Sequence, residues 1–323
     1  MKFMISNSKA KYFNLKDFEL SNEIQRSFLV KNLDKICKNT GFLLINGHGI
    51  NKKIINNIWS VVDIFFDQPI NLKERVRPPF KGYPYGYLGH GIEALAHSKG
   101  NKTPPDLKES FNAGPISIPK SVNQKDALEF CYAPSLWPEI SNFKNYWIEY
   151  YNSMQNLAWR IMRALALALN LDENYFNSYI NEPISALRAL NYPSLQDIVL
   201  PNQQMAGAHT DYGSLTILLP KDDTKGLQIQ NLDGEWIDIP CDPNVFVVNI
   251  GDLMAQWTND RWVSTLHRVV PNKNNTPRRS LAFFHQPNWD ADIKCIESCK
   301  GDKIKYKPVK SGPYLMTKFK STL

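Results

Sequence analysis

The chain has 323 residues, of which 43% are hydrophobic and 21% are charged, and its formal net charge is +7. This composition is that of a globular protein and excludes disordered and fibrous classes, and the length suits one large domain. The basic residues are scattered, without a basic helix, a zinc finger or an aromatic RNA-binding motif. We therefore expect no nucleic-acid partner, and the positive charge suits small anionic substrates equally well.

Membrane insertion and disulfide bonding are not expected either. The chain has no apolar run of about 18 residues, and its N-terminus lacks the apolar segment of a secretory signal, so we expect a soluble cytoplasmic protein without a membrane partner. The five cysteines are an odd number without CxxC or Cys/His finger spacing. This pattern indicates neither a disulfide framework nor a zinc module.

The first third of the chain predicts helix, strand and helix. Helical periodicity runs over residues 16–39, with apolar positions that include Phe18, Ile24 and Phe28. The apolar run 42–45 is typical of a buried strand, and a second helix is expected to end before Pro69.

Residues 78–138 show no sustained period and are rich in Gly, Pro, Tyr and Asn. A structureless loop of this length inside a domain usually has a function. We therefore expect substrate contacts here, although the alternative is a lid that packs through its aromatic rings. The candidates are Tyr83, Tyr85, Tyr87, His90, Lys108, Glu109, Phe111 and Asn112.

A long helix and then a series of strands follow. Helical periodicity extends over about 143–171, and the helix is expected to lie against the back of a sheet. Short strand-like runs follow at 186–192, 205–209, 214–219, 227–230, 235–239, 245–250, 264–270 and 279–286. This number of strands predicts a mainly β fold with helices, built on a double-sheet jelly roll. We treat 1–140 as an N-terminal helical and loop region and 141–323 as the catalytic core of one integrated domain.

His209 and Asp211 lie two residues apart at the end of a strand-like run, so their side chains project from the same face. His267 lies in a later strand with apolar neighbours. Two histidines and one carboxylate form the facial triad that suits non-haem iron(II) and leaves coordination positions open. For each residue alone a structural role is the more common one, so this prediction depends on the residues that accompany the triad.

Arg278 and Ser280 share one strand face, where a guanidinium and a hydroxyl suit a carboxylate such as the distal one of 2-oxoglutarate. Upstream, Arg188 and Tyr192 also share a face, and Tyr192 is placed to add a hydrogen bond to the same carboxylate. The alternatives are a surface charge for Arg188 and a core ring for Tyr192.

Several segments resemble the isopenicillin N synthase-like iron/2-oxoglutarate oxygenases: AGAHTDYGSLTILLP, GLQIQNLDGEWIDIP, VVNIGDLMAQWTNDRWVSTLHRVV and RRSLAFF. The resemblance covers most of the chain. It implies a distorted jelly roll, or double-stranded β-helix, flanked by N-terminal and central helices. It also implies iron ligands at His209, Asp211 and His267, and 2-oxoglutarate contacts from Arg278, Ser280 and Tyr192. Plant members often carry Asn where this chain has Leu190.

The resemblance implies an oxygenase that uses Fe(II), 2-oxoglutarate and O2, with ascorbate as a stimulant. We expect it to oxidise a C–H bond of a small carboxylate-bearing, amino-acid-like molecule by hydroxylation, desaturation or ring closure, releasing succinate and CO2. Arg188 is expected to bind an acidic group of the substrate and Phe284 to line the cavity. The alternatives are an oxidase of the same fold that does not use 2-oxoglutarate, and a non-catalytic metal-binding jelly-roll protein. The oligomeric state is open, and a monomer is compatible with the sequence.

Overall fold

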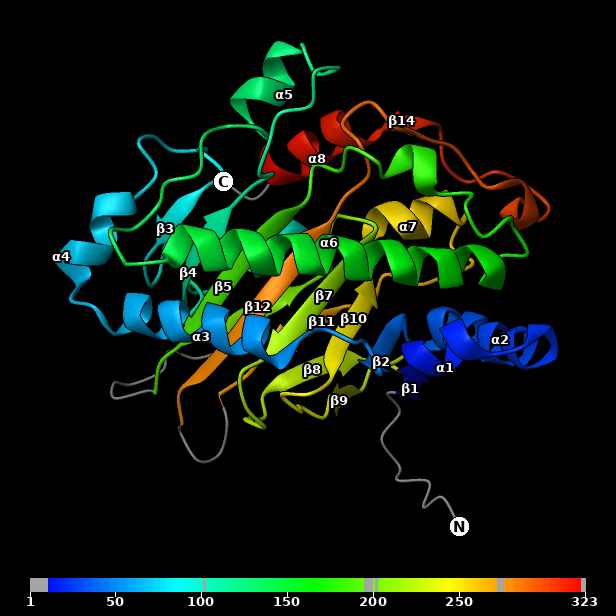
Figure 1. Cartoon of the computed structure of the whole chain (residues 1–323), viewed down its shortest axis with the longest axis horizontal. Coiled ribbons are helices and arrows are strands. Elements are labelled where there is room, and N and C mark those ends of the chain that lie inside the picture. Colours follow the sequence, from blue (N-terminus) through cyan, green and yellow to red (C-terminus); the bar gives the residue numbers. More distant parts are fainter. Residues whose placement is uncertain (1–10, 101–102, 195–199, 201–202, 272–275, 321–323) are drawn as a thin grey trace.

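The computed structural model describes residues 11–100, 103–194, 200, 203–271 and 276–320, and its centre is a pair of facing β-sheets (Figure 1). The larger, eight-stranded sheet has the order β1-β2-β10-β7-β12-β5-β4-β3, and a four-stranded sheet has the order β6-β11-β8-β9. The strands of the larger sheet, in that order, are Lys11–Asn14, Phe42–Asn46, Phe246–Ile250, Leu215–Pro220, Arg278–His285, Ala186–Tyr192, Glu109–Ala113 and Gly86–Leu88. Those of the smaller sheet are Ala206–His209, His267–Val269, Leu227–Gln230 and Trp236–Asp238, and β13 (Asp292–Ile293) pairs with β14 (Val309–Lys310).

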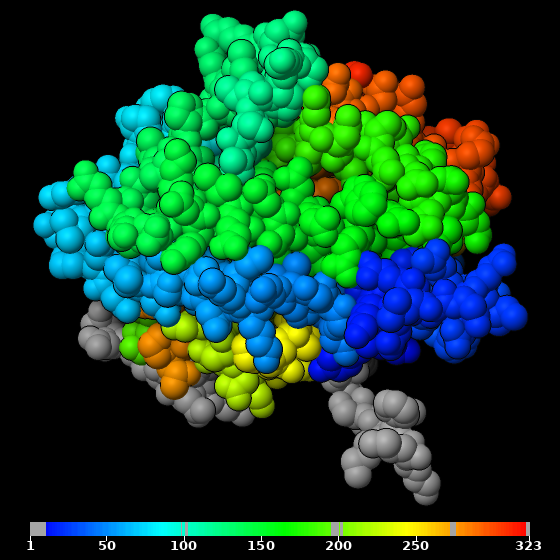
Figure 2. All heavy atoms as spheres, in the orientation of Figure 1, coloured from blue at the N-terminus to red at the C-terminus, as the bar shows by residue number. Residues whose placement is uncertain are grey.

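Helices cover the outer face of the larger sheet. The long α6 (Phe143–Ala168) crosses this face with α3 (Lys52–Asp67) beside it (Figure 1). In the space-filling view of Figure 2, green and blue atoms fill the centre of the molecule on this side. The other α-helices are α1 (Leu15–Leu20), α2 (Glu23–Asn39), α4 (Ile70–Lys73), α5 (Lys125–Glu129), α7 (Asp252–Trp257) and α8 (Ser311–Lys320). Short 3-10 turns lie at Glu74–Val76, Leu95–Lys99, Asn177–Tyr179 and Glu297–Cys299. None of the described helices is long and apolar enough to cross a lipid bilayer.

The two faces of the larger sheet bury different cores. Alternate residues of a strand point to opposite faces, so Leu187 and Leu281 pack with α6 residues such as Trp147 in the outer core. On the inner face, Leu190 and Ala282 pack in a separate cluster with residues of the smaller sheet. The space between the sheets is therefore walled on both sides by strands, and this is where the site lies.

The structure confirms the predicted jelly-roll core, since each of the strand-like runs from 186 to 286 contains one strand. It corrects the expected helix over 16–39, which divides into α1 and α2. The division occurs because Asn22 caps a new helix, accepting a hydrogen bond from the Gln25 N–H while the Gln25 side chain accepts one from the Asn22 N–H. Ile24 and Phe28, expected on the apolar side, are exposed.

The expectation of a structureless loop over 78–138 is wrong, because β3 and β4 extend the larger sheet through this segment. Tyr87, Glu109 and Phe111 all point to the outer face. The ring centroid of Phe111 lies 5.2 Å from that of Phe65, and Glu109 accepts a hydrogen bond from Lys73 at 2.7 Å. These three residues therefore belong to the outer core, and the expectation that they contact substrate is corrected.

A stability measurement tests this assignment. Phe111→Ala removes a fully buried ring, so the free energy of unfolding is expected to fall by about 3–5 kcal/mol. The matched control Phe28→Ala removes an exposed ring of α2 and should change the free energy of unfolding by less than about 0.5 kcal/mol. Urea denaturation measures the free energy of unfolding of both variants and of the wild type. Equal effects of the two substitutions would contradict the packing described here.

Candidate metal centre

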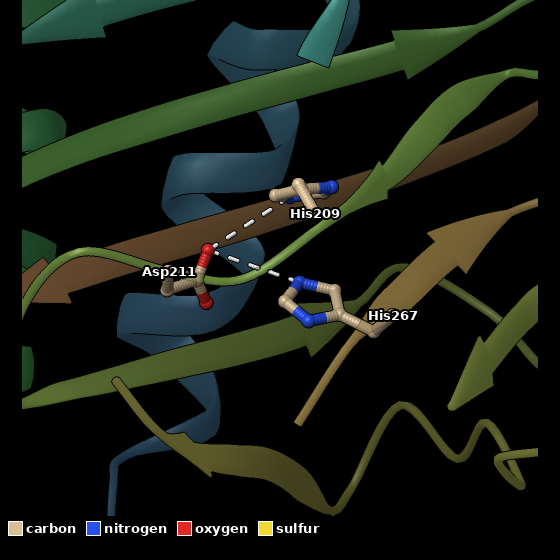
Figure 3. Close-up of side chains that lie close together, drawn as sticks. All are labelled: His209, Asp211 and His267. Atoms are coloured by element: carbon tan, nitrogen blue, oxygen red, sulfur yellow. Dashed lines mark ion pairs between the residues drawn. The ribbon is translucent and has the colours of Figure 1, made fainter. Parts of the chain in front are cut away.

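Three side chains, from two strands of the smaller sheet and the segment that follows one of them, converge between the sheets. His209 ends β6, Asp211 follows two residues later, and His267 begins β11 directly opposite His209 in the strand register. Asp211 Oδ1 lies 3.8 Å from the Nε2 atom of each histidine (Figure 3). Potential ligand atoms of all three residues lie within 4.8 Å of one another, which is close enough to share one metal ion.

Neighbouring groups orient these side chains for metal binding. The Nδ1 atom of His209 lies 2.7 Å from the Gly207 carbonyl oxygen, and Nδ1 of His267 lies 3.1 Å from the Thr265 carbonyl oxygen. A carbonyl oxygen only accepts, so each Nδ1 donates and each Nε2 keeps its lone pair for a metal. Burial, followed by the charge of His267, lowers the pKa of His209 to about 3, so this imidazole is neutral at physiological pH.

Asp211 is held by one of its two oxygens. Asn249 on β10 donates a hydrogen bond to Asp211 Oδ2 at 2.7 Å, which leaves Oδ1 directed at the two imidazoles. Burial alone would raise the pKa of Asp211, but the two histidines and the hydrogen bonds to the carboxylate together outweigh this effect and lower the pKa. Two imidazoles and one carboxylate beside a cavity are the ligand set of non-haem iron(II).

A second site suits an anion. The side chain of Arg278 is 4% exposed, yet its Nε and Nη2 atoms have no hydrogen-bond partner among the described residues. Its Nη1 lies 3.3 Å from Ser280 Oγ, and its guanidinium lies 5.2 Å from the ring centroid of Tyr192. A buried cation without a counterion is costly. These residues therefore fit the distal carboxylate of 2-oxoglutarate, which would satisfy the open donors.

A cavity of about 220 Å³ lies beside the triad. Its walls include the three triad residues, Tyr192 and five of the predicted substrate-binding residues, and its roof includes α8 and the segment after α5. The five predicted residues are Tyr85, Lys108, Asn112, Arg188 and Phe284. The roof is apolar, because Phe319 of α8 packs on Phe130 with ring centroids 4.9 Å apart.

One wall of the cavity is a buried network of opposite charges. Glu93 accepts hydrogen bonds from Arg188 Nη1 at 3.2 Å and lies 3.0 Å from Lys108 Nζ. Lys108 also lies 2.9 Å from Asp106, which accepts a hydrogen bond from the Gly207 N–H at 2.9 Å. Burial alone would raise the pKa of Glu93, but Arg188 and Lys108 outweigh it and lower the pKa to about 2. The bond to Gly207 ties this wall to β6, the strand that carries His209.

Comparisons with known proteins agree with this geometry. Residues 183–287 match the model of the 2OG-Fe(II) oxygenase superfamily, and residues 13–140 match that of the non-haem dioxygenase in morphine synthesis N-terminal region. The chain is 34% identical to the homoarginine-6-hydroxylase 2-ODD-233 of Oryza sativa over 303 residues, covering 90% of this chain and 88% of the relative. It is 33% identical to the 2-oxoglutarate-dependent dioxygenase citB of Monascus ruber, covering 81% and 79%.

The chain belongs to the 2OG-Fe(II) oxygenase superfamily. Its fold matches that of a full-length Neurospora crassa protein solved in complex with alpha-KG, with a TM-score of 0.85, 29% identity, and coverage of 97% of this chain and 96% of that one. The predicted family, the dioxygenase class, and the use of iron and 2-oxoglutarate are confirmed. Relatives named as 2-oxoglutarate-dependent dioxygenases favour this class over an oxidase that does without 2-oxoglutarate.

Sequence reasoning missed several residues of this oxygenase site. Asn249 was detectable in principle, because it alternates with the outward-pointing Val248 in the run before Gly251. Glu93 and Asp106 have no local signal, since they come from irregular segments and meet Arg188 and Lys108 only in the folded chain. The α8 residues that line the cavity also meet the site only in the folded chain. Two candidates from the sequence, Tyr83 and His90, do not line the cavity.

The role of Asn249 gives a second prediction. Asn249→Ala removes the hydrogen bond that orients Asp211, and loss of such a supporting contact typically costs about 10–100-fold in metal affinity. Anaerobic titration with Fe(II) measures this change. Asn191→Ala is the matched control, because Asn191 is a buried asparagine that bonds to Glu109 and Arg279. The control should lower the melting temperature and leave iron affinity unchanged; weaker iron binding in the control would contradict the assignment.

Proposed function

We propose that this protein hydroxylates a C–H bond of a small polar molecule. In this proposal His209, Asp211 and His267 hold Fe(II), and Arg278, Ser280 and Tyr192 hold 2-oxoglutarate. The supporting observation is a facial triad together with the buried guanidinium of Arg278, two of whose nitrogens have no partner among the described residues. This guanidinium lies over the ring of Tyr192, which lines the cavity beside the triad. When bound, iron and 2-oxoglutarate supply the oxidising power for C–H cleavage, with succinate and CO2 as coproducts.

The protein's own side chains position the substrate and keep water away. Phe284, Phe42 and Phe130 contribute rings to the cavity, while Arg188, Lys108 and Glu93 contribute a charged wall. Ordered walls of this kind hold a reacting bond near its oxidant and limit side reactions. The apolar side chains of α8 that line the cavity also limit the access of water.

The relatives narrow the proposed substrate. The Oryza sativa relative is named a homoarginine-6-hydroxylase, and the Neurospora crassa protein was also solved with thymine. Homoarginine is an amino acid and thymine a cyclic amide, and both carry nitrogen and a carbonyl oxygen. We therefore propose a small nitrogen-containing substrate with a carboxylate or related carbonyl group, and hydroxylation rather than desaturation or ring closure. Arg188 is paired with Glu93, so a substrate carboxylate would have to share or replace this contact.

Coproduct formation tests this proposal. The protein is purified without oxygen, loaded with Fe(II), 2-oxoglutarate and ascorbate, and offered a panel of amino acids and small cyclic and acyclic amides. At least one compound should stimulate succinate release together with a hydroxylated product. Oxygen uptake without succinate would instead support an oxidase, and failure to bind iron would support a jelly-roll protein that holds another metal.

A further inference from the structure

Asn112 presents an unused hydrogen-bond donor to the cavity. Its side chain lines the cavity and is 4% exposed, yet its Nδ2 atom has no hydrogen-bond partner in the part of the chain that the structure describes. A buried amide group without a partner costs about 1–3 kcal/mol. A ligand that supplies an acceptor would remove this cost.

The orientation of the Asn112 amide follows from its neighbour. Asn112 on β4 lies directly opposite Arg188 on β5, and Arg188 Nε donates a hydrogen bond to Asn112 Oδ1. A guanidinium has no acceptor, so the amide oxygen must face Arg188 and the NH2 group must point away from it. The strand pairing therefore fixes which end of the amide is available to a ligand.

The charges around Asn112 favour an uncharged acceptor. The two cations Lys108 and Arg188 are matched by the two carboxylates Glu93 and Asp106, so this wall has no formal net charge. A ligand carboxylate placed at Asn112 would approach Glu93, which contacts Arg188, without an excess cation to compensate. A neutral carbonyl oxygen accepts from the Asn112 NH2 group without this repulsion.

We propose that Asn112 is a substrate-binding residue whose NH2 group donates a hydrogen bond to a neutral carbonyl oxygen, so that the substrate presents a carboxamide, lactam or ureide group at this wall. The inference rests on the proposed function, because it assumes that the cavity holds the molecule to be oxidised. It identifies a neutral carbonyl group as the part of the substrate that Asn112 recognises, and so makes Asn112 a determinant of specificity.

Three probes with six carbon atoms each test the inference: hexanamide, hexanoate and hexylamine. The full chain is loaded with Fe(II) and 2-oxoglutarate without oxygen, and the dissociation constant of each probe is measured by calorimetry. The wild type should bind hexanamide about tenfold more tightly than the other two, as one neutral hydrogen bond allows. Tighter binding of hexanoate, or no detectable binding of hexanamide, would overturn the proposal.

Asn112→Asp isolates the donor. The aspartate keeps an oxygen for Arg188 Nε and replaces the NH2 group with an acceptor, so hexanamide affinity should fall at least about tenfold while hexylamine gains. Asn112→Ala, which removes both ends of the amide, should show the same loss for hexanamide without the gain for hexylamine. Unchanged hexanamide affinity in either variant would overturn the proposal.

Ser110→Ala is the matched control, on the same strand and the same face but outside the cavity lining. It should bind hexanamide as the wild type does. Binding of 2-oxoglutarate to each iron-loaded protein is measured in parallel. If the wild type does not bind 2-oxoglutarate, the proposed function fails; if it does and the probes do not discriminate, the role of Asn112 alone is wrong.

Discussion

His209→Ala is expected to abolish turnover. The substitution removes one of three ligands, and the remaining imidazole and carboxylate cannot complete the facial set that iron(II) requires. Loss of a supporting contact already costs about 10–100-fold in metal affinity, so loss of a ligand should exceed that range. Iron content after anaerobic loading and succinate release measure the two consequences separately.

The matched control for this substitution is His97→Ala, because His97 is an exposed histidine outside the cavity lining. Iron content and succinate release should both match the wild type. An active His209→Ala protein with normal iron content would show that the metal is held elsewhere.

Arg278→Met is expected to raise the concentration of 2-oxoglutarate needed for half-maximal turnover. Removing one partner of a buried charge pair costs about 2–5 kcal/mol, which corresponds to roughly 30-fold to several-thousand-fold in affinity. Methionine keeps a similar apolar volume, so the strand should remain packed. Titration of 2-oxoglutarate against succinate release, with iron affinity measured in parallel, checks the effect.

The adjacent arginine provides a control from the same strand. Arg279 points to the outer face, where it forms ion pairs with Asp63 and Asp67. Arg279→Met should therefore lower the melting temperature and leave the 2-oxoglutarate requirement unchanged. If Arg279→Met raised this requirement as much as Arg278→Met, the carboxylate site would have to be reassigned.

The alternation of residues within short segments was enough to predict most strands and the pairing of two metal ligands. In an extended segment successive side chains alternate between two faces, and this alternation can be read from the sequence alone. It predicts the strands and also predicts that His209 and Asp211, two residues apart, share a face. The same alternation separates Asn112 from Phe111 on β4, but the Pro and Gly residues on either side of this short strand obscure its period. Residues from both faces were consequently expected to contact substrate.

Contacts between segments that are far apart in the chain could not be predicted from the sequence. The meeting of Arg188 with Glu93, and of Asn249 with Asp211, depends on which segments become neighbours and on the register of the strands that carry Arg188 and Asn249. A shift of one residue in the register of β5 or β10 would turn Arg188 or Asn249 to the other face of the sheet. No short segment contains that information.

The sequence by itself determined the strand series, the long central helix, the candidate metal ligands and the likeness to a family of iron and 2-oxoglutarate oxygenases. The tertiary structure alone decided that Arg188 is paired with Glu93, and that buried nitrogens of Arg278 and Asn112 have no hydrogen-bond partner among the described residues. The physical reason is that periodicity determines which face a side chain occupies, whereas partners, burial and charge balance depend on segments brought together only by folding.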